Sequence, residues 1–152
     1  MGDLLGAYTI GSGASWYEGT DYSNPEHRKN MMESARKMVE EFKDEPYVLF
    51  WMLGNENNYG VANNAKKNPQ AYYSSVNETA KMIKSIDRDH PVAVSSGDLL
   101  FLDVFSKLAP DVDIYGSNAY RGKYGFGKSS FWERAKDICD KPIIITEYGC
   151  PA

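Results

Sequence analysis

The sequence predicts an α/β fold in which parallel strands alternate with helices. Short apolar runs of strand length recur along the chain, and the stretches between them carry apolar residues at helical spacing. This alternation favours a parallel sheet with helices packed outside it. At 152 residues, 42% of them hydrophobic, the chain has the length and apolar content of one domain, residues 1–152.

The first elements predicted are a strand, a loop and a helix. Residues 2–14 indicate a short strand that leads into a glycine-rich loop, where glycine permits the backbone angles required. Asn24 offers an N-cap and Pro25 a first helical position. Apolar residues at helical spacing then mark an amphipathic helix: Met31, Ala35, Met38, Val39 and Phe42.

A continuous apolar run follows at residues 47–53 and ends at Gly54. Parallel strands that are buried on both faces have this composition. Residues 57–69 are polar and rich in asparagine, which indicates a long loop after the strand. A second helix is predicted by the spacing of Tyr72, Val76, Thr79, Ile83 and Ile86.

The same rhythm continues through the second half of the chain. Apolar runs predict strands, and helical spacing predicts helices between them. The expected strands are 91–95, 113–117 and 142–146, and the expected helices are 99–108 and 131–138.

Composition excludes several classes of partner and site. With 17 Lys+Arg against 21 Asp+Glu, the net charge is −4, which argues against nucleic acid as a partner. No run reaches the ~18 apolar residues of a membrane span, so no membrane partner is expected. Two cysteines without a C-x-x-C pair, and His27 and His90 far apart, predict no metal site and no histidine triad. The cellular compartment stays open.

Two apolar strands each end at a glutamate. Glu56 follows the run 47–53, and Glu147 follows the run 142–146. The carboxyl ends of parallel strands meet at the edge of the sheet where ligands bind, so we expect the two carboxylates to converge there. Glycoside hydrolysis requires such a pair, one protonated and one ionised. Their proximity should raise the pKa of one of them.

These segments carry a resemblance to a known family. Trp51-Met-Leu-Gly-Asn-Glu56 resembles the acid/base strand of clan A retaining glycoside hydrolases, especially family two, which includes β-galactosidases and β-glucuronidases. The resemblance extends from about Leu4 to Gly149 and covers strands three to seven of the family's eight. It implies an incomplete (β/α) TIM-barrel segment, with about five of eight strands.

The resemblance implies a role for each matching residue. Glu56 would be the acid/base and Glu147 the nucleophile of a retaining β-glycosidase that works by double displacement, without metal or other cofactor. Asn55 would bind the 2-hydroxyl of a carbohydrate substrate.

Further substrate contacts are implied between these segments and before them. Asn118, Tyr120 and Arg121 are candidate substrate-binding residues. In Asn118-Ala-Tyr120, the tyrosine would hydrogen-bond the nucleophile, and Arg121 is a candidate neighbour. Trp16 either lines a sugar subsite or covers the barrel edge. Residues 147–150 also resemble the nucleophile segment of fungal β-1,3-glucan transglycosylases, so hydrolysis and transfer both stay open.

Two other interpretations remain. In the first, the chain is a non-catalytic or inactive glycosidase-like fragment that binds carbohydrate or needs partner strands. Whether or not it is catalytic, we expect open sheet edges around Leu4–Ile10 and Ile143–Glu147, so that it self-associates through them or belongs to a longer parent. Alternatively, Gly122–Ser129 matches the phosphate-loop pattern G-x-x-x-x-G-K-S of nucleotide-binding proteins. Against nucleotide binding, no second apolar strand ends in a magnesium-binding aspartate.

Overall fold

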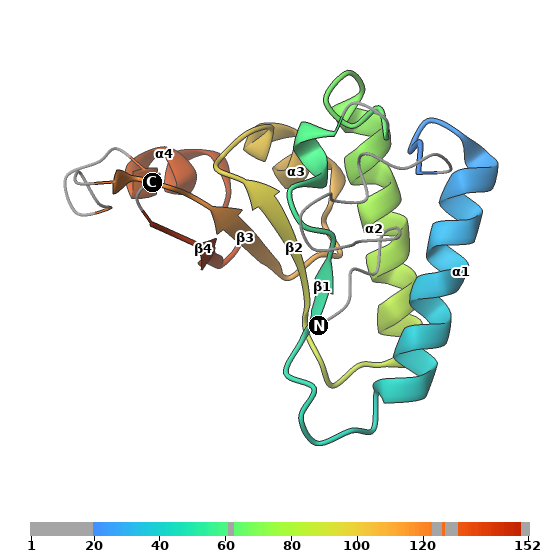
Figure 1. Cartoon of the computed structure of the whole chain (residues 1–152). Helices are drawn as coiled ribbons and strands as arrows, with labels where there is room; N and C mark the ends of the chain where they lie inside the picture. Colours follow the sequence, from blue (N-terminus) through green and yellow to red (C-terminus); the bar gives the residue numbers. More distant parts are fainter. Residues whose placement is uncertain (1–19, 61–62, 123–125, 127–130, 150–152) are drawn as a thin grey trace.

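A computed structural model describes residues 20–60, 63–122, 126 and 131–149. Its centre is a sheet of β1 (Trp51–Leu53), β2 (Val92–Gly97), β3 (Ile114–Asn118) and β4 (Ile143–Glu147). The strands lie in chain order, and each pairs in parallel with the next (Figure 1). This confirms the predicted fold class, an incomplete (β/α) barrel segment. The strand expected within residues 2–14 lies outside the described residues.

The helices alternate with the strands, as predicted. They are α1 (Pro25–Phe42), α2 (Pro69–Ile86), α3 (Leu102–Leu108) and α4 (Phe131–Ile138), and a short 3₁₀ helix, η2 (Asn57–Tyr59), follows β1. Successive α-helices contact one another, and Figure 1 shows α1 and α2 side by side along one flank of the sheet. None of these described helices has the length and hydropathy needed to cross a membrane.

The two long helices begin with the same pair of residues. Asn24 Oδ1 accepts hydrogen bonds from the backbone N–H groups of Glu26 and His27, and Pro25 occupies the first turn. Asn68 Oδ1 accepts from the backbone of Ala71 in the same way, ahead of Pro69. An asparagine cap satisfies backbone donors that have no partner within the helix, which explains why both helices start where they do.

Two expected elements are shorter in the structure. The strand predicted over 47–53 is wrong in its first half, because β1 begins at Trp51 and the side chains of Tyr47 and Leu49 are 70% exposed. A turn in which the backbone of Val48 bonds to Glu45 occupies that segment instead. The helix expected from residue 99 begins at Leu102, after Asp98 and Phe101 adopt positive φ angles of 47° and 62°.

The core between sheet and helices is strongly aromatic. A chain of ring contacts, with centroids 4.7 to 5.7 Å apart, links the start of α1 to β3 through Tyr22, Tyr72, Tyr73, Phe105 and Tyr115. All five side chains are fully buried. Aromatic side chains contribute most to core packing when they are buried in such tilted arrangements. Four of the chain's 11 tyrosines are therefore core residues.

An irregularity at the end of β3 shapes the functional edge of the sheet. Ser117 pairs with Ile145, but Asn118 pairs with Glu147, so Thr146 is an extra residue in β4. A Cβ atom on Gly116 would lie 2.8 Å from Thr146 Cγ2 and 2.7 Å from the Val94 carbonyl oxygen. Glycine at position 116 therefore leaves room for the Thr146 side chain beside Asn118.

Candidate active site

The residues expected to form a site lie at one edge of the sheet, after the carboxyl ends of the strands. Asn55 and Glu56 follow β1, Asn118 ends β3 with Tyr120 just beyond it, and Glu147 ends β4. Parallel strands carry their ligand sites at this edge. Residues more than 60 positions apart in the sequence thus become neighbours.

A hydrogen-bonded group of four side chains joins all four strands at this edge. Asn118 Nδ2 donates to Asn55 Oδ1 over 3.0 Å, and Thr146 Oγ1 donates to Asn118 Oδ1 over 2.5 Å. Ser95 Oγ lies 3.3 Å from Asn55 Oδ1, 3.1 Å from Asn118 Oδ1 and 3.3 Å from Thr146 Oγ1. These contacts hold β1, β2, β3 and β4 in register beside the glutamates.

The neighbouring hydrogen-bond donors determine the orientation of the Asn55 side-chain amide. Both hydrogen bonds that the described residues make to the Asn55 side chain use its oxygen, Oδ1. Asn118 provides an N–H donor there, and the Ser95 hydroxyl has one hydrogen to share among its three neighbours. The Asn55 Nδ2 group is consequently directed away from these partners, and it is available to donate to a ligand.

Ser95 and Thr146 were not among the predicted site residues. Their signal in the sequence is a small hydroxyl side chain near the end of an otherwise apolar strand, in Val92-Ala-Val-Ser-Ser and Ile143-Ile-Ile-Thr. A buried hydroxyl needs a hydrogen-bond partner, so such residues mark the start of the polar edge.

Glu56 has an unusual backbone and a perturbed carboxyl group. Its φ of 55° and ψ of 23° lie in the left-handed region, which costs a residue with a Cβ roughly 1–2 kcal/mol. Its N–H donates to the Ser95 carbonyl over 3.0 Å, so the conformation is tied to β2. Burial raises the pKa of Glu56, a hydrogen bond from Asn118 partly offsets this, and the charge of Glu147 raises the pKa further.

Glu147 is held in a different way. Tyr120 Oη donates a 2.6 Å hydrogen bond to Glu147 Oε2, and the backbone of Ala119 donates to the Glu147 carbonyl over 2.9 Å. The bond to the carboxylate, together with partial desolvation and the charge of Glu147, raises the pKa of the Tyr120 hydroxyl. The two glutamates therefore differ in their surroundings: burial acts on the Glu56 carboxyl group, whereas the Glu147 carboxylate accepts a hydrogen bond from a tyrosine hydroxyl.

Arg121 binds Asp98, which sequence reasoning did not select. Arg121 Nη2 lies 2.5 Å from Asp98 Oδ1, and the guanidinium carbon is 4.8 Å from the centroid of the Phe131 ring. The Asp98 carbonyl accepts hydrogen bonds from the Tyr115 and Ser117 hydroxyls. The Arg121 side chain thus connects the turn after β2 to the start of α4.

Other expected positions fall outside the described residues or away from the edge. Trp16 and most of Gly122–Ser129 lie outside the described residues. His27 Nδ1 accepts from the Asp21 backbone, and His90 Nδ1 lies 2.8 Å from Asp87 Oδ2, so both histidines have structural partners. Within the described part of the chain, His, Cys, Asp and Glu side chains form no group of three or more suited to a metal ion.

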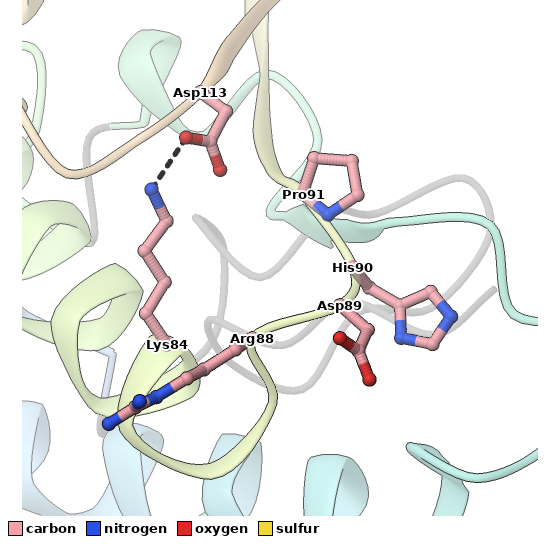
Figure 2. Close-up of a pocket in the computed structure, with 6 residues that line it drawn as sticks. All are labelled: Lys84, Arg88, Asp89, His90, Pro91 and Asp113. Atoms are coloured by element: carbon pink, nitrogen blue, oxygen red, sulfur yellow. Dashed lines mark hydrogen bonds and ion pairs between the residues drawn. The ribbon is translucent and has the colours of Figure 1, made fainter.

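A surface pocket lies at the other end of the strands. Figure 2 shows it between the last turn of α2 and the segments that lead into β2 and β3, with Lys84 Nζ paired to Asp113 over 2.5 Å. It is lined by Lys84, Arg88, Asp89, His90, Pro91 and Asp113. The amino ends of strands in (β/α) barrels contribute to stability, whereas chemistry occurs at the carboxyl ends. This pocket is therefore separate from the glutamate site.

Comparison with protein families gives one match that covers most of the chain. Residues 7–152 match the family described as glycosyl hydrolases family 2, TIM barrel domain. The chain is 30% identical over 141 residues to protein EPD2 of Candida maltosa, covering 84% of this chain and 25% of that protein. It is also 30% identical over 128 residues to a β-galactosidase of Kluyveromyces lactis, covering 83% of this chain and 10% of that protein.

Solved structures share the fold at lower identity. A β-glucuronidase of Bacteroides uniformis superposes with a TM-score of 0.62 at 21% identity, over 82% of this chain and 16% of that one. The exo-β-1,4-mannosidase Op5Man5 from Opitutaceae bacterium strain TAV5 gives a TM-score of 0.69 at 14% identity, over 96% and 31%. The chain thus spans a quarter or less of the two curated relatives above and less than a third of these structures.

Proposed function

Because this chain belongs to the TIM barrel domain of glycosyl hydrolases family 2, we propose that it carries the catalytic centre of a retaining β-glycosidase. Glu147 is the nucleophile and Glu56 the general acid/base. The substrate is a β-linked carbohydrate, and the reaction proceeds by double displacement at the anomeric carbon.

The observation that supports this proposal best is the contrast between the two carboxyl groups. Burial and the charge of Glu147 raise the pKa of Glu56, which favours a proton on that carboxyl. Glu147 instead accepts a hydrogen bond from the Tyr120 hydroxyl. Enzymes assign acid and base roles to two like groups by giving them such different surroundings.

The first step uses both groups at once. Glu147 attacks the anomeric carbon, and the bond between that carbon and the leaving oxygen breaks as Glu56 transfers its proton to the oxygen. The electron pair of the broken bond remains on the protonated leaving group. A glycosyl ester on Glu147 results, and Glu56 is now ionised.

The second step reverses the roles. Ionised Glu56 takes a proton from water, and the hydroxide oxygen attacks the anomeric carbon as the ester bond to Glu147 breaks. Two inversions give net retention. If the hydroxyl group of a second sugar replaces water, the same step gives transglycosylation.

Asn55 is the residue that we propose to bind the sugar beside Glu56. Its oxygen is engaged by Asn118, so Nδ2 is available to donate to the sugar. We assign that donor to the 2-hydroxyl, a contact that contributes to rate where it strengthens in the transition state. Asn118 contacts both Asn55 and Glu56, so it positions the two residues that act on the sugar.

Azide rescue separates the two catalytic roles. A panel of aryl β-glycosides identifies the sugar, and Glu56→Ala and Glu147→Gly are then assayed in the intact protein with sodium azide. Azide should replace water on the glycosyl ester in Glu56→Ala and give the β-azide. In Glu147→Gly it should attack the substrate directly and give the α-azide. Identical azides from both variants would contradict the assignment.

Turnover is expected from the intact protein and not from these 152 residues alone. The described sheet ends at β1 and β4, whereas a complete barrel closes eight strands on themselves. Open edges bind other strands, so the isolated chain should self-associate or need the remaining strands of a longer parent. Light scattering combined with an aryl glycoside assay tests this, and a monomer with full turnover would contradict it.

A further inference from the structure

Tyr59 is the exposed residue of a turn that is otherwise buried. It ends η2, which begins one residue after Glu56. Asn57 and Asn58 in that turn are fully buried, whereas Tyr59 is 43% exposed. Asn57 Nδ2 donates to the Tyr22 hydroxyl over 2.7 Å, and Asn58 Oδ1 accepts from the backbone of Gly97 over 2.9 Å. The turn is therefore fixed, and the position of Tyr59 relative to Glu56 is fixed with it.

The Tyr59 ring rests on the last residue of β2. A Cβ atom added at Gly97 would lie 1.7 Å from Tyr59 Cε2. Only glycine at this position lets the ring come so close to the strand. One part of the ring is thus supported by backbone, and the remainder is open to solvent at the carboxyl edge of the sheet.

The charges of two carboxylates at this edge act on the Tyr59 hydroxyl. Burial raises the pKa of Tyr59, and the charges of Glu56 and Asp98 raise it further. The Tyr59 N–H also donates to the Glu56 carbonyl over 3.0 Å. The ring therefore belongs to the surroundings of the acid/base residue.

We propose that Tyr59 is the platform on which the leaving-group sugar stacks, and on which an acceptor sugar stacks in transglycosylation. This inference rests on the proposed role of Glu56. A general acid protonates the oxygen that joins the two sugars, so the leaving sugar lies beside that acid. A rigid, half-exposed aromatic ring offers an apolar face to the C–H groups of a pyranose.

Asp98 indicates that the ligand on this platform carries hydroxyl groups. Within the described residues, the hydrogen bonds to its carboxylate end on Oδ1, from the Leu99 backbone over 2.8 Å and from Arg121 over 2.5 Å. The second oxygen, Oδ2, accepts neither of these bonds. An aromatic ring next to a carboxylate acceptor suits a sugar better than an alkyl or aryl group.

Two substrates with the same glycon separate this role from the rest of catalysis. A β-linked disaccharide places a sugar on the platform, whereas the β-glycosyl fluoride has a leaving group that needs none. In the intact protein, Tyr59→Ala should lower kcat/KM for the disaccharide about tenfold, the effect of losing one aromatic contact. It should leave kcat/KM for the fluoride unchanged, and Tyr59→Phe should retain activity on both substrates.

Two further variants control for structural effects. Tyr47→Ala removes an exposed tyrosine from the opposite end of β1 and should change neither substrate. Gly97→Ala should displace the ring and reproduce the loss on the disaccharide, but it should cause no additional loss in a Tyr59→Ala background.

Each alternative result has a distinct meaning. An equal loss on both substrates, or no loss on the disaccharide, would overturn the platform while leaving Glu56 and Glu147 in their roles. If the unsubstituted protein does not turn over the glycosyl fluoride, the proposed function fails, and the platform fails with it.

Discussion

Tyr120 Oη and Glu147 Oε2 are joined by a 2.6 Å hydrogen bond that links the segment after β3 to the end of β4. Tyr120 is 53% exposed, so its hydrogen bond does more to hold the Glu147 carboxylate in place than to stabilise the core. It is the contact that most clearly distinguishes the surroundings of Glu147 from those of Glu56.

Tyr120→Phe removes this bond and little else. Because the proposed nucleophile loses a hydrogen-bond donor, we expect kcat to fall about tenfold. The free energy of unfolding should stay close to that of the unsubstituted protein, since the ring is retained and half-exposed. Tyr148→Phe, at a neighbouring and 78% exposed tyrosine, should leave kcat unchanged. A similar loss in both variants would mean that the hydroxyl of Tyr120 has no special role.

Glu147→Gln should lower the pKa of Glu56. The negative charge of Glu147 is one of the causes that raise this pKa, and glutamine removes the charge while keeping the shape of the side chain. In the unsubstituted protein, activity should fall as the pH rises through the raised pKa, because the acid form of Glu56 is then lost.

A ¹³C NMR titration of glutamate carboxyl groups measures the Glu56 pKa directly, with Glu56→Gln to assign the signal. Glu45→Gln, an exposed substitution before β1, serves as the control and should not move the signal. A Glu56 pKa that is unchanged or higher in Glu147→Gln would show that the two carboxyl groups do not interact.

Glu56→Gly should be more stable than Glu56→Ala by about 1 kcal/mol, because only glycine adopts a φ of 55° without a steric penalty. Both variants lack the carboxyl group, so their difference isolates the backbone. In α1, Glu40→Gly should instead be less stable than Glu40→Ala by roughly 0.5–1 kcal/mol. Urea unfolding measures both pairs, and an order at position 56 like that at position 40 would rule out the strained backbone.

Asp87, which lies at the opposite end of the sheet, should make the free energy of unfolding depend on pH. Burial tends to raise its pKa, but hydrogen bonds from Trp51 Nε1 at 2.7 Å and from His90, with further backbone donors, leave the pKa below its ordinary value of 3.8. A pKa that is lowered in the folded state stabilises the folded protein at pH values above the pKa of the unfolded chain. This contribution disappears as the pH falls through the pKa of the folded state.

Urea unfolding of the unsubstituted protein and of Asp87→Asn between about pH 6 and pH 3 tests this dependence. The unsubstituted protein should be the more stable one at pH 6, and the difference should shrink on acidification. Asp89→Asn, at the exposed neighbouring aspartate, should follow the unsubstituted protein. A difference that is constant with pH would contradict the role of Asp87.

Local rules predicted the helices and the order of the strands well. Asn24 with Pro25 marks a helix start by capping chemistry alone, and α4 has the predicted bounds Phe131–Ile138. The strand predicted over residues 47–53 was wrong in its first half, because an apolar composition does not by itself show that a segment is buried. Its first residues form a turn at the surface, and only the last three enter the sheet.

The candidate site was predictable in part. Glu56 and Glu147 were selected because a charge after an apolar strand is unusual, and both lie at the carboxyl edge of the sheet. Ser95 and Thr146 were missed because their contacts depend on strand register and on the extra residue in β4, which no local pattern encodes. Tyr59 and Tyr72 are the same residue type and cannot be told apart by composition, yet Tyr59 is exposed beside Glu56 and Tyr72 is fully buried. Only the fold separates these roles.

The assignment of Glu147 as the nucleophile is tested most directly by trapping the glycosyl ester. A 2-deoxy-2-fluoro-β-glycosyl fluoride of the preferred glycon slows hydrolysis of the ester, so the intermediate accumulates and its mass is measured on the intact protein. Peptide mapping by mass spectrometry should place one glycosyl group on Glu147, and Glu147→Gly should take up none. A label on Glu56, or on any residue other than Glu147, would contradict the proposed mechanism.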